Sequence, residues 1–119
     1  MEITFRKGTE EVGIVRILNK SLYFGKIIQG IPYWLPLEKL NIGVEGIVKQ
    51  FPDLEGKPYN EIKQEGARRL KEHIKTMKTE EEIKDYVINE IEAWLGAKAV
   101  VITKPGFRPQ IIRRGEDAQ

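Results

Sequence analysis

The chain of 119 residues contains no cysteine, which excludes a disulfide framework and thiolate chemistry. Histidine occurs once, at His73, and serine once, at Ser21. A zinc site needs several protein ligands, and a serine nucleophile needs an adjacent base, so these residues cannot supply either kind of site. No glycine-rich phosphate loop followed by lysine and serine or threonine is present. We therefore expect a protein that is not an enzyme and that holds no metal and no cofactor.

Long apolar runs are also missing. No stretch approaches the roughly 20 apolar residues that a transmembrane helix needs. The N-terminus from Met1 to Arg6 lacks the basic-then-apolar layout of a signal peptide and alternates as a strand does. The sequence therefore predicts a cytoplasmic protein with no membrane partner.

Charged residues, in contrast, are plentiful. They make up 32% of the chain, above the roughly 25% typical of globular proteins. A high content of lysine and glutamate is typical of proteins from hyperthermophiles, although ordinary drift in a small protein would produce it too. The net charge of +2 is too small to imply a polyanionic partner by itself. Positive charge gathers toward the C-terminus, because the stretch from Lys98 to Arg114 has no acidic residue.

The length of the chain fits a single domain, since domains of roughly 100–150 residues are the commonest. We predict one α+β domain over residues 1–114 and a frayed tail over residues 115–119.

The first third of the chain has the pattern of a meander of short antiparallel strands. Ile3 and Phe5 alternate with polar residues, which is the period of two of a half-buried strand. Residues 12–18 are apolar on both faces apart from Arg16, as expected for a central strand.

A hairpin completes this predicted meander. Residues 22–28 and 31–35 are expected to pair across a tight turn at residues 29–30, which are glutamine and glycine. Within this hairpin we assign Phe24 and Trp34 to the core.

The centre of the chain predicts an αα-hairpin. Pro58 suits the first turn of a helix, and the following apolar residues recur at spacings of three and four. The apolar stripe of the first helix comprises Tyr59, Ile62, Gly66, Leu70, Ile74 and Met77, and its opposite face comprises Lys63, Arg68, Arg69, Lys71 and Lys75. Thr79 and Glu82 form a capping box at the start of the second helix, and Gly96 ends it. Only residues 78 and 79 separate the predicted helices, so they should fold back on each other.

Two further segments complete the prediction. Residues 42–51 fit a strand and a helix equally well. Residues 97–103 are β-rich, the turn from Lys104 to Phe107 has proline and glycine where a type II turn needs them, and residues 110–114 are expected to return as an edge strand. The predicted fold class is therefore α+β, with an N-terminal antiparallel β-meander, a central αα-hairpin and a C-terminal β-hairpin that extends the sheet.

Basic residues interleaved with aromatic residues are the feature most suggestive of function. Proteins that bind single-stranded nucleic acid combine cations, which neutralise phosphates, with aromatic rings on which bases stack. On this basis we predict a non-enzymatic protein that binds single-stranded DNA or RNA through a sheet face and the C-terminal turn. The candidate binding residues are Arg16, Lys26, Tyr33, Lys104, Phe107, Arg108, Arg113 and Arg114.

Two alternatives remain open at this point. The apolar stripes of two helices exceed what one small sheet can cover, which predicts a homodimer or another docked protein. The strand edge near residues 110–113 is a second candidate interface.

Asp53 followed by Glu61 and Lys63 loosely resembles the residue order of metal-dependent nucleases of the restriction-enzyme type, although that order needs the glutamate and the lysine on a core strand.

Overall fold

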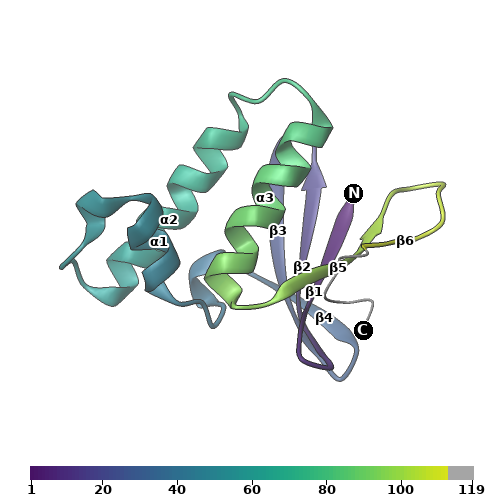
Figure 1. The fold of residues 1–119 in the computed structure, drawn as a ribbon, viewed down its shortest axis with the longest axis horizontal. Coiled ribbons are helices and arrows are strands. Elements are labelled where there is room, and N and C mark those ends of the chain that lie inside the picture. The colour runs from purple at the N-terminus through teal and green to yellow at the C-terminus, as the bar shows by residue number, and fades with distance from the viewer. Residues whose placement is uncertain (113–119) are drawn as a thin grey trace.

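A computed structural model describes residues 1–112, which form one sheet with helices packed against it (Figure 1). The strands are β1 (Glu2–Lys7), β2 (Glu10–Leu18), β3 (Ser21–Ile28), β4 (Ile31–Leu35), β5 (Lys98–Thr103) and β6 (Gln110–Ile111). The helices are α1 (Val44–Gln50), α2 (Tyr59–Ile74) and α3 (Glu80–Leu95). Single 3-10 turns at Leu37–Lys39 and Pro52–Leu54 flank α1.

The sheet has the strand order β4-β3-β2-β1-β5-β6, and each pair of neighbours is antiparallel. The predicted fold class is therefore confirmed: the meander comes first, the helices follow, and the C-terminal hairpin extends the sheet beside β1. Figure 1 shows the turn between β5 and β6 projecting away from the side on which the helices lie.

Two tight turns set the register of the meander. Gln29 and Gly30 have φ of 51° and 79°, and Asn19 and Lys20 have φ of 48° and 64°. Positive φ at both central residues is the signature of type I′ turns, whose twist matches that of the strands they join. The predicted turn at residues 29–30 is confirmed.

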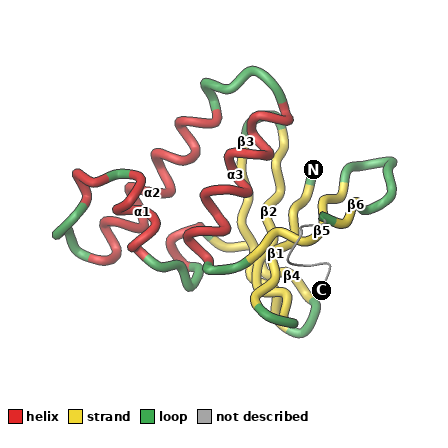
Figure 2. Tube along the Cα trace, in the orientation of Figure 1, coloured by secondary structure: helices red, strands yellow, loops and turns green. Residues whose placement is uncertain are grey.

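The core lies between the sheet and the helices, all of which sit on one side of it (Figure 2). Alternate residues of the strands face this side and are buried, among them Ile3, Phe5, Val15, Phe24 and Ile102. The helices contribute their apolar stripes, with Leu70 and Val87 fully buried. One face of the sheet is therefore buried in the core.

Helix α1 settles the ambiguity of residues 42–51. It packs against both longer helices, and two glycines allow the close approach. A β-carbon added at Gly66 of α2 would lie 2.6 Å from Cγ2 of Ile47, and one at Gly46 of α1 would lie 3.1 Å from Cδ1 of Trp94. Because α1 covers part of both stripes, the apolar surface predicted to need a partner is largely buried within the chain.

The αα-hairpin is confirmed, but its connection is longer than predicted. Helix α2 ends at Ile74, so residues 75–79 join it to α3. The amides of Lys75, Thr76 and Met77 each donate to the carbonyl three residues back, which tightens the chain out of the α-helix. The predicted cap of α3 is present, since the Glu82 amide donates to the Thr79 hydroxyl at 3.1 Å.

Lys63 differs from its prediction as part of an exposed basic face. It is buried, with 7% of its surface exposed. Its ammonium donates to the Leu40 carbonyl at 3.0 Å and lies 4.9 Å from the ring centroid of Tyr59. The segment that precedes α1 runs over this part of α2, so the lysine satisfies a backbone carbonyl instead of facing solvent.

Within the described part of the chain, no helix is both long enough and apolar enough to span a bilayer. The predicted tail over residues 115–119 lies outside the described residues, as do Arg113 and Arg114.

Candidate nucleic-acid interface on the open face of the sheet

The face of the sheet turned away from the helices is built from two rows of cross-strand partners. Partners in an antiparallel ladder point to the same side of the sheet. One row crosses every strand from β4 to β6 and consists of Trp34, Gly25, Ile14, Thr4, Val101 and Ile111. The second row consists of Tyr23, Arg16, Glu2 and Thr103. We call these two rows the open face; with strands about 4.8 Å apart, the longer row is about 24 Å wide.

Trp34 and Arg16 form a stacked pair at one end of the open face. The guanidinium carbon of Arg16 lies 4.4 Å from the ring centroid of Trp34. On its other side Arg16 is fixed by Glu2, which accepts a hydrogen bond from its Nε at 2.7 Å. A planar guanidinium held against an indole is itself a surface on which a base can stack.

Gly25 makes room for this arrangement. A β-carbon at Gly25 would lie 2.8 Å from Cγ2 of Ile14 and 3.2 Å from Cε3 of Trp34. The indole therefore lies partly across the glycine, where any side chain on β3 would push it off the sheet. Tyr23, two residues earlier on the same strand, stands half exposed beside Arg16.

Trp34 is not part of the core, so that assignment was wrong. The residue is 40% exposed, whereas Phe24 is buried as predicted. The reason is the register: Phe24 pairs with Leu35 and Gly25 pairs with Trp34. Phe24 and Trp34 consequently point to opposite sides of the sheet, and only one side is covered by helices.

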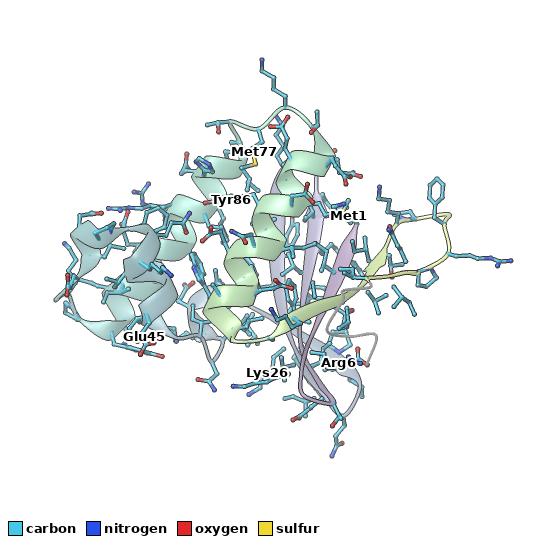
Figure 3. All side chains as sticks on the ribbon, viewed as in Figure 1. Met1, Arg6, Lys26, Glu45, Met77 and Tyr86 are labelled. Atoms are coloured by element: carbon cyan, nitrogen blue, oxygen red, sulfur yellow. The ribbon has the colours of Figure 1, made fainter. Side chains whose placement is uncertain are left out.

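Lys26 and Tyr33 are partners of each other, but they do not join Arg16. They share the side of Phe24, which is the helix side. Both side chains are exposed; Figure 3 shows Lys26 below the helices. The structure thus separates the predicted binding residues of the meander into two sites on opposite faces.

The predicted C-terminal turn is formed as expected. Gly106 has φ of 80°, and the Phe107 amide donates to the Lys104 carbonyl at 3.1 Å. Phe107 is 74% exposed and Arg108 is also exposed. Lys104 instead reaches Glu80 at the start of α3, at 3.6 Å. The turn offers one ring and one guanidinium to solvent.

Tyr23, Trp34 and the threonines of the open face were missing from the predicted site. A usable signal was present in the sequence. Once the two-residue turn at 29–30 is placed, strand parity puts residue 34 opposite residue 25 and on the same face as residue 23. A glycine opposite a tryptophan, flanked by a tyrosine, indicates an aromatic surface that lies flat on a sheet.

Asp53, the first residue of the nuclease hypothesis, is bound to Arg69. Both carboxylate oxygens of Asp53 accept hydrogen bonds from Arg69, at 2.8 and 2.6 Å, and these bonds lower the pKa of Asp53. Lys63 and Glu61 lie on helix α2, not on a core strand. Within residues 1–112, no group of three or more histidines or acidic side chains is arranged to hold a metal ion.

Comparison of the chain with protein-family models, with curated proteins and with solved structures found no match.

Proposed function

We propose that the protein binds single-stranded nucleic acid, DNA or RNA, along the open face of the sheet. The observation that carries this proposal is the stacked pair of Arg16 and Trp34 beside Tyr23, on a face that no helix of the described residues covers. Flat, half-exposed rings and a guanidinium on an uncovered sheet are the means by which sheets recognise unpaired bases.

The roles of the side chains follow from their positions. Tyr23 offers an exposed ring, and the pair of Arg16 and Trp34 offers a guanidinium plane that is backed by the indole. The hydroxyls of Thr4 and Thr103 lie further along the two rows, where they can hydrogen-bond to sugar or base edges. Phe107 and Arg108 stand exposed in the turn after β5, at the end of the sheet opposite β4.

A pair of tyrosines with equal exposure tests the proposal. Tyr23 on the open face and Tyr33 on the helix side are 50% and 48% exposed, so Tyr33→Ala is a matched control for Tyr23→Ala. Loss of one stacked base costs about 1–3 kcal/mol, which is about 5- to 150-fold in Kd. We expect Tyr23→Ala to weaken binding by this factor and Tyr33→Ala to leave binding unchanged.

The measurement is fluorescence anisotropy with labelled single strands and duplexes that carry no terminal phosphate, repeated across a salt series. Single strands should bind more tightly than duplexes, and the affinity should fall with salt because phosphate contacts release counterions. Equal losses in Tyr23→Ala and Tyr33→Ala, or no binding of any strand at low salt, would refute the proposal.

Docking of a second copy of the chain on the same face is the other candidate function. It is favoured by the apolar side chains that accompany the aromatic residues there, including Leu18 and Ile111, which are 47% and 63% exposed. The ion pair between Glu2 and Arg16 leaves the middle of the face without net charge. Sedimentation at rising protein concentration distinguishes self-association from nucleic-acid binding. A dimer that is lost in Trp34→Ala would favour self-association, and a monomer at all concentrations would exclude it.

The remaining inferences from composition, a cytoplasmic location and an origin in a thermophile, stay predictions. A melting temperature above 90 °C would support the thermophilic origin, since that is about where hyperstable proteins begin.

A further inference from the structure

A small hollow on the helix side of the sheet lies apart from the open face. It has a volume of about 140 Å³, and its lining residues are Lys7, Val12, Lys26, Leu40, Asn41 and Leu95. They come from the end of β1, from β2 and β3, from the segment before α1 and from the last residue of α3. Two lysines and one asparagine therefore line the hollow together with three apolar residues.

Neither of the two lysines that line this hollow belongs to an ion pair of the described residues, and Glu92 of α3 lies beside Lys7 in a neighbouring hollow. No carboxylate lines the hollow. The nearest acidic residues in register, Glu10 opposite Lys7 and Glu11 opposite Arg6, are exposed in the adjoining turn.

Hydrogen bonds hold the segment that supplies Asn41 on both sides of that residue. The Leu40 carbonyl accepts a hydrogen bond from the Lys63 ammonium at 3.0 Å, and the Ile42 carbonyl accepts one from the Tyr59 hydroxyl at 2.9 Å. The Gly43 amide donates to the carbonyl of Trp94 at 2.9 Å. Asn41 itself is exposed, so a rigid segment presents a polar side chain at the rim.

Lys63 adds a third positive charge behind the wall of the hollow. Its ammonium is buried and bound to the carbonyl of Leu40, which is itself a lining residue. A cation in a region of low dielectric acts over a longer range than one in water. The hollow is therefore surrounded by three basic side chains and lined by no acidic one.

The negative C-terminal end of helix α3 offsets only part of this positive charge. Its last turn contains no basic residue, and a helix C-terminus carries about half an elementary negative charge. Three ammonium groups exceed what this partial charge needs. The hollow is thus suited to an anion from outside the chain.

We infer that the hollow binds a phosphate group, held by Lys7 and Lys26 with the Asn41 amide as a neutral donor. Its volume is below the roughly 300–1,000 Å³ of pockets that enclose whole small molecules, so it takes an anionic head group and leaves the rest of a ligand outside. Ammonium groups are common phosphate ligands because they act as compact point charges. This inference does not rest on the open face and is tested separately from it.

The test is a titration of the ¹⁵N-labelled chain with inorganic phosphate, followed by NMR at constant ionic strength with chloride as the replaced anion. We expect saturable shifts of the side-chain amide of Asn41. Removing one charge-assisted hydrogen bond should weaken binding about tenfold, so Lys26→Gln should raise Kd by that factor. Lys49→Gln, which removes an exposed lysine on α1, is the matched control and should leave Kd unchanged.

Asn41→Ala, followed through the backbone amides of Lys7 and Lys26, separates a built site from general attraction, because it leaves the charge unaltered and should still weaken binding. Far-UV circular dichroism checks that each variant folds. Shifts that rise linearly and spread over all surface lysines, or equal Kd in Lys26→Gln and Lys49→Gln, would overturn the inference. So would equal shifts at Asn41 with adenosine, which has no phosphate.

Adenosine 5′-monophosphate identifies the source of the phosphate. Tighter binding than inorganic phosphate at the same residues would assign the hollow to phosphomonoesters, including the phosphorylated ends of strands. Equal binding would assign it to free phosphate. Both results support the site, and both are distinguishable from loss of strand binding in Tyr23→Ala.

Discussion

Individual side chains show the clearest consequences of burial where the three helices meet. The Gln50 amide donates to the Tyr86 hydroxyl at 2.8 Å, and the rings of Tyr86 and His73 are 4.7 Å apart. Burial raises the pKa of Tyr86, and the nearby charge of Glu90 raises it further. Burial also raises the pKa of Glu90, against the lowering effects of a hydrogen bond with Asn89 and of the charge of His73.

The raised pKa of Glu90 has a consequence for stability. A carboxyl whose pKa is higher in the folded state binds its proton more tightly there, so the free energy of unfolding falls as the pH rises from about 4 through the folded pKa. We predict that Glu90→Gln is more stable than the parent chain at pH 7 and that the difference closes at lower pH, where the parent is protonated.

Urea unfolding of both chains at several pH values measures this difference, with Glu55→Gln as the control because Glu55 is exposed in a loop. A Glu90→Gln chain that is equally or less stable at pH 7 would show that the carboxylate is well solvated or well paired.

At the scale of elements, the short helix α1 holds the two long helices together through close contacts at glycine. Ile47 of α1 fits against Gly66 of α2, and Gly46 of α1 fits against Trp94 of α3. A second contact fixes the loop after α1, where Asp53 binds Arg69 of α2 through two hydrogen bonds. Helix α1 is therefore placed by shape on one side and by an ion pair on the other.

Substitution at Gly66 tests this packing. Alanine favours the helical state by about 1 kcal/mol relative to glycine, but overpacking a core costs about 1–3 kcal/mol, and the new carbon would lie 2.6 Å from Ile47. We predict a net destabilisation of about 1–2 kcal/mol in Gly66→Ala, measured by denaturant unfolding.

Two further variants isolate the cause. Gln64→Ala, on the exposed side of α2, should change stability by less than about 0.5 kcal/mol. In an Ile47→Ala background the added cost of Gly66→Ala should shrink, because the clashing atoms are gone. An unchanged cost there would mean that the glycine is needed for another reason.

The edge strand β4 is protected against pairing with a strand of another chain. Residues 28 and 31 close the two-residue turn and form a hydrogen-bonded pair, so the next pair, Ile27 and Pro32, is not hydrogen-bonded and Pro32 turns its nitrogen outward. A proline at that position removes a donor from the free edge of β4. The free edge of β4 therefore offers one donor fewer to a strand of another chain.

At the scale of the whole molecule, a six-stranded sheet carries its helices on one side and leaves the other side to its surroundings. The strands at the two ends of the chain lie side by side, since β5 pairs with β1. Sheet and helices therefore share one core, and neither part can bury its apolar face alone.

This arrangement predicts cooperative unfolding of a single unit. Trp94 is buried among the helices and Trp34 is half exposed on the sheet, so the single-tryptophan variants Trp34→Phe and Trp94→Phe report on the two layers separately. Their fluorescence transitions in urea should coincide with each other and with that of far-UV circular dichroism. Separate midpoints in the same variant would mean that the layers unfold independently.

Apart from residues 42–51, which fit a strand and a helix equally well, the sequence by itself determined the elements and their order. Period-two alternation, the glycine-containing turn at residues 29–30, the cap at Thr79 and the left-handed Gly96 are local features, and the structure has each of them. Local features suffice for elements because backbone preferences and capping act within a few residues.

Only the tertiary structure decided which faces meet solvent. Trp34 is exposed and Lys63 is buried, the reverse of their predictions, because both depend on which side of the sheet the helices cover and on where the chain before α1 runs. Residues 44–50 form a helix because a close fit at Gly66 and Trp94 was available to them. The candidate binding residues are also divided between two faces. Strand register, which spans distant parts of the sequence, sets the side of the sheet on which each residue lies.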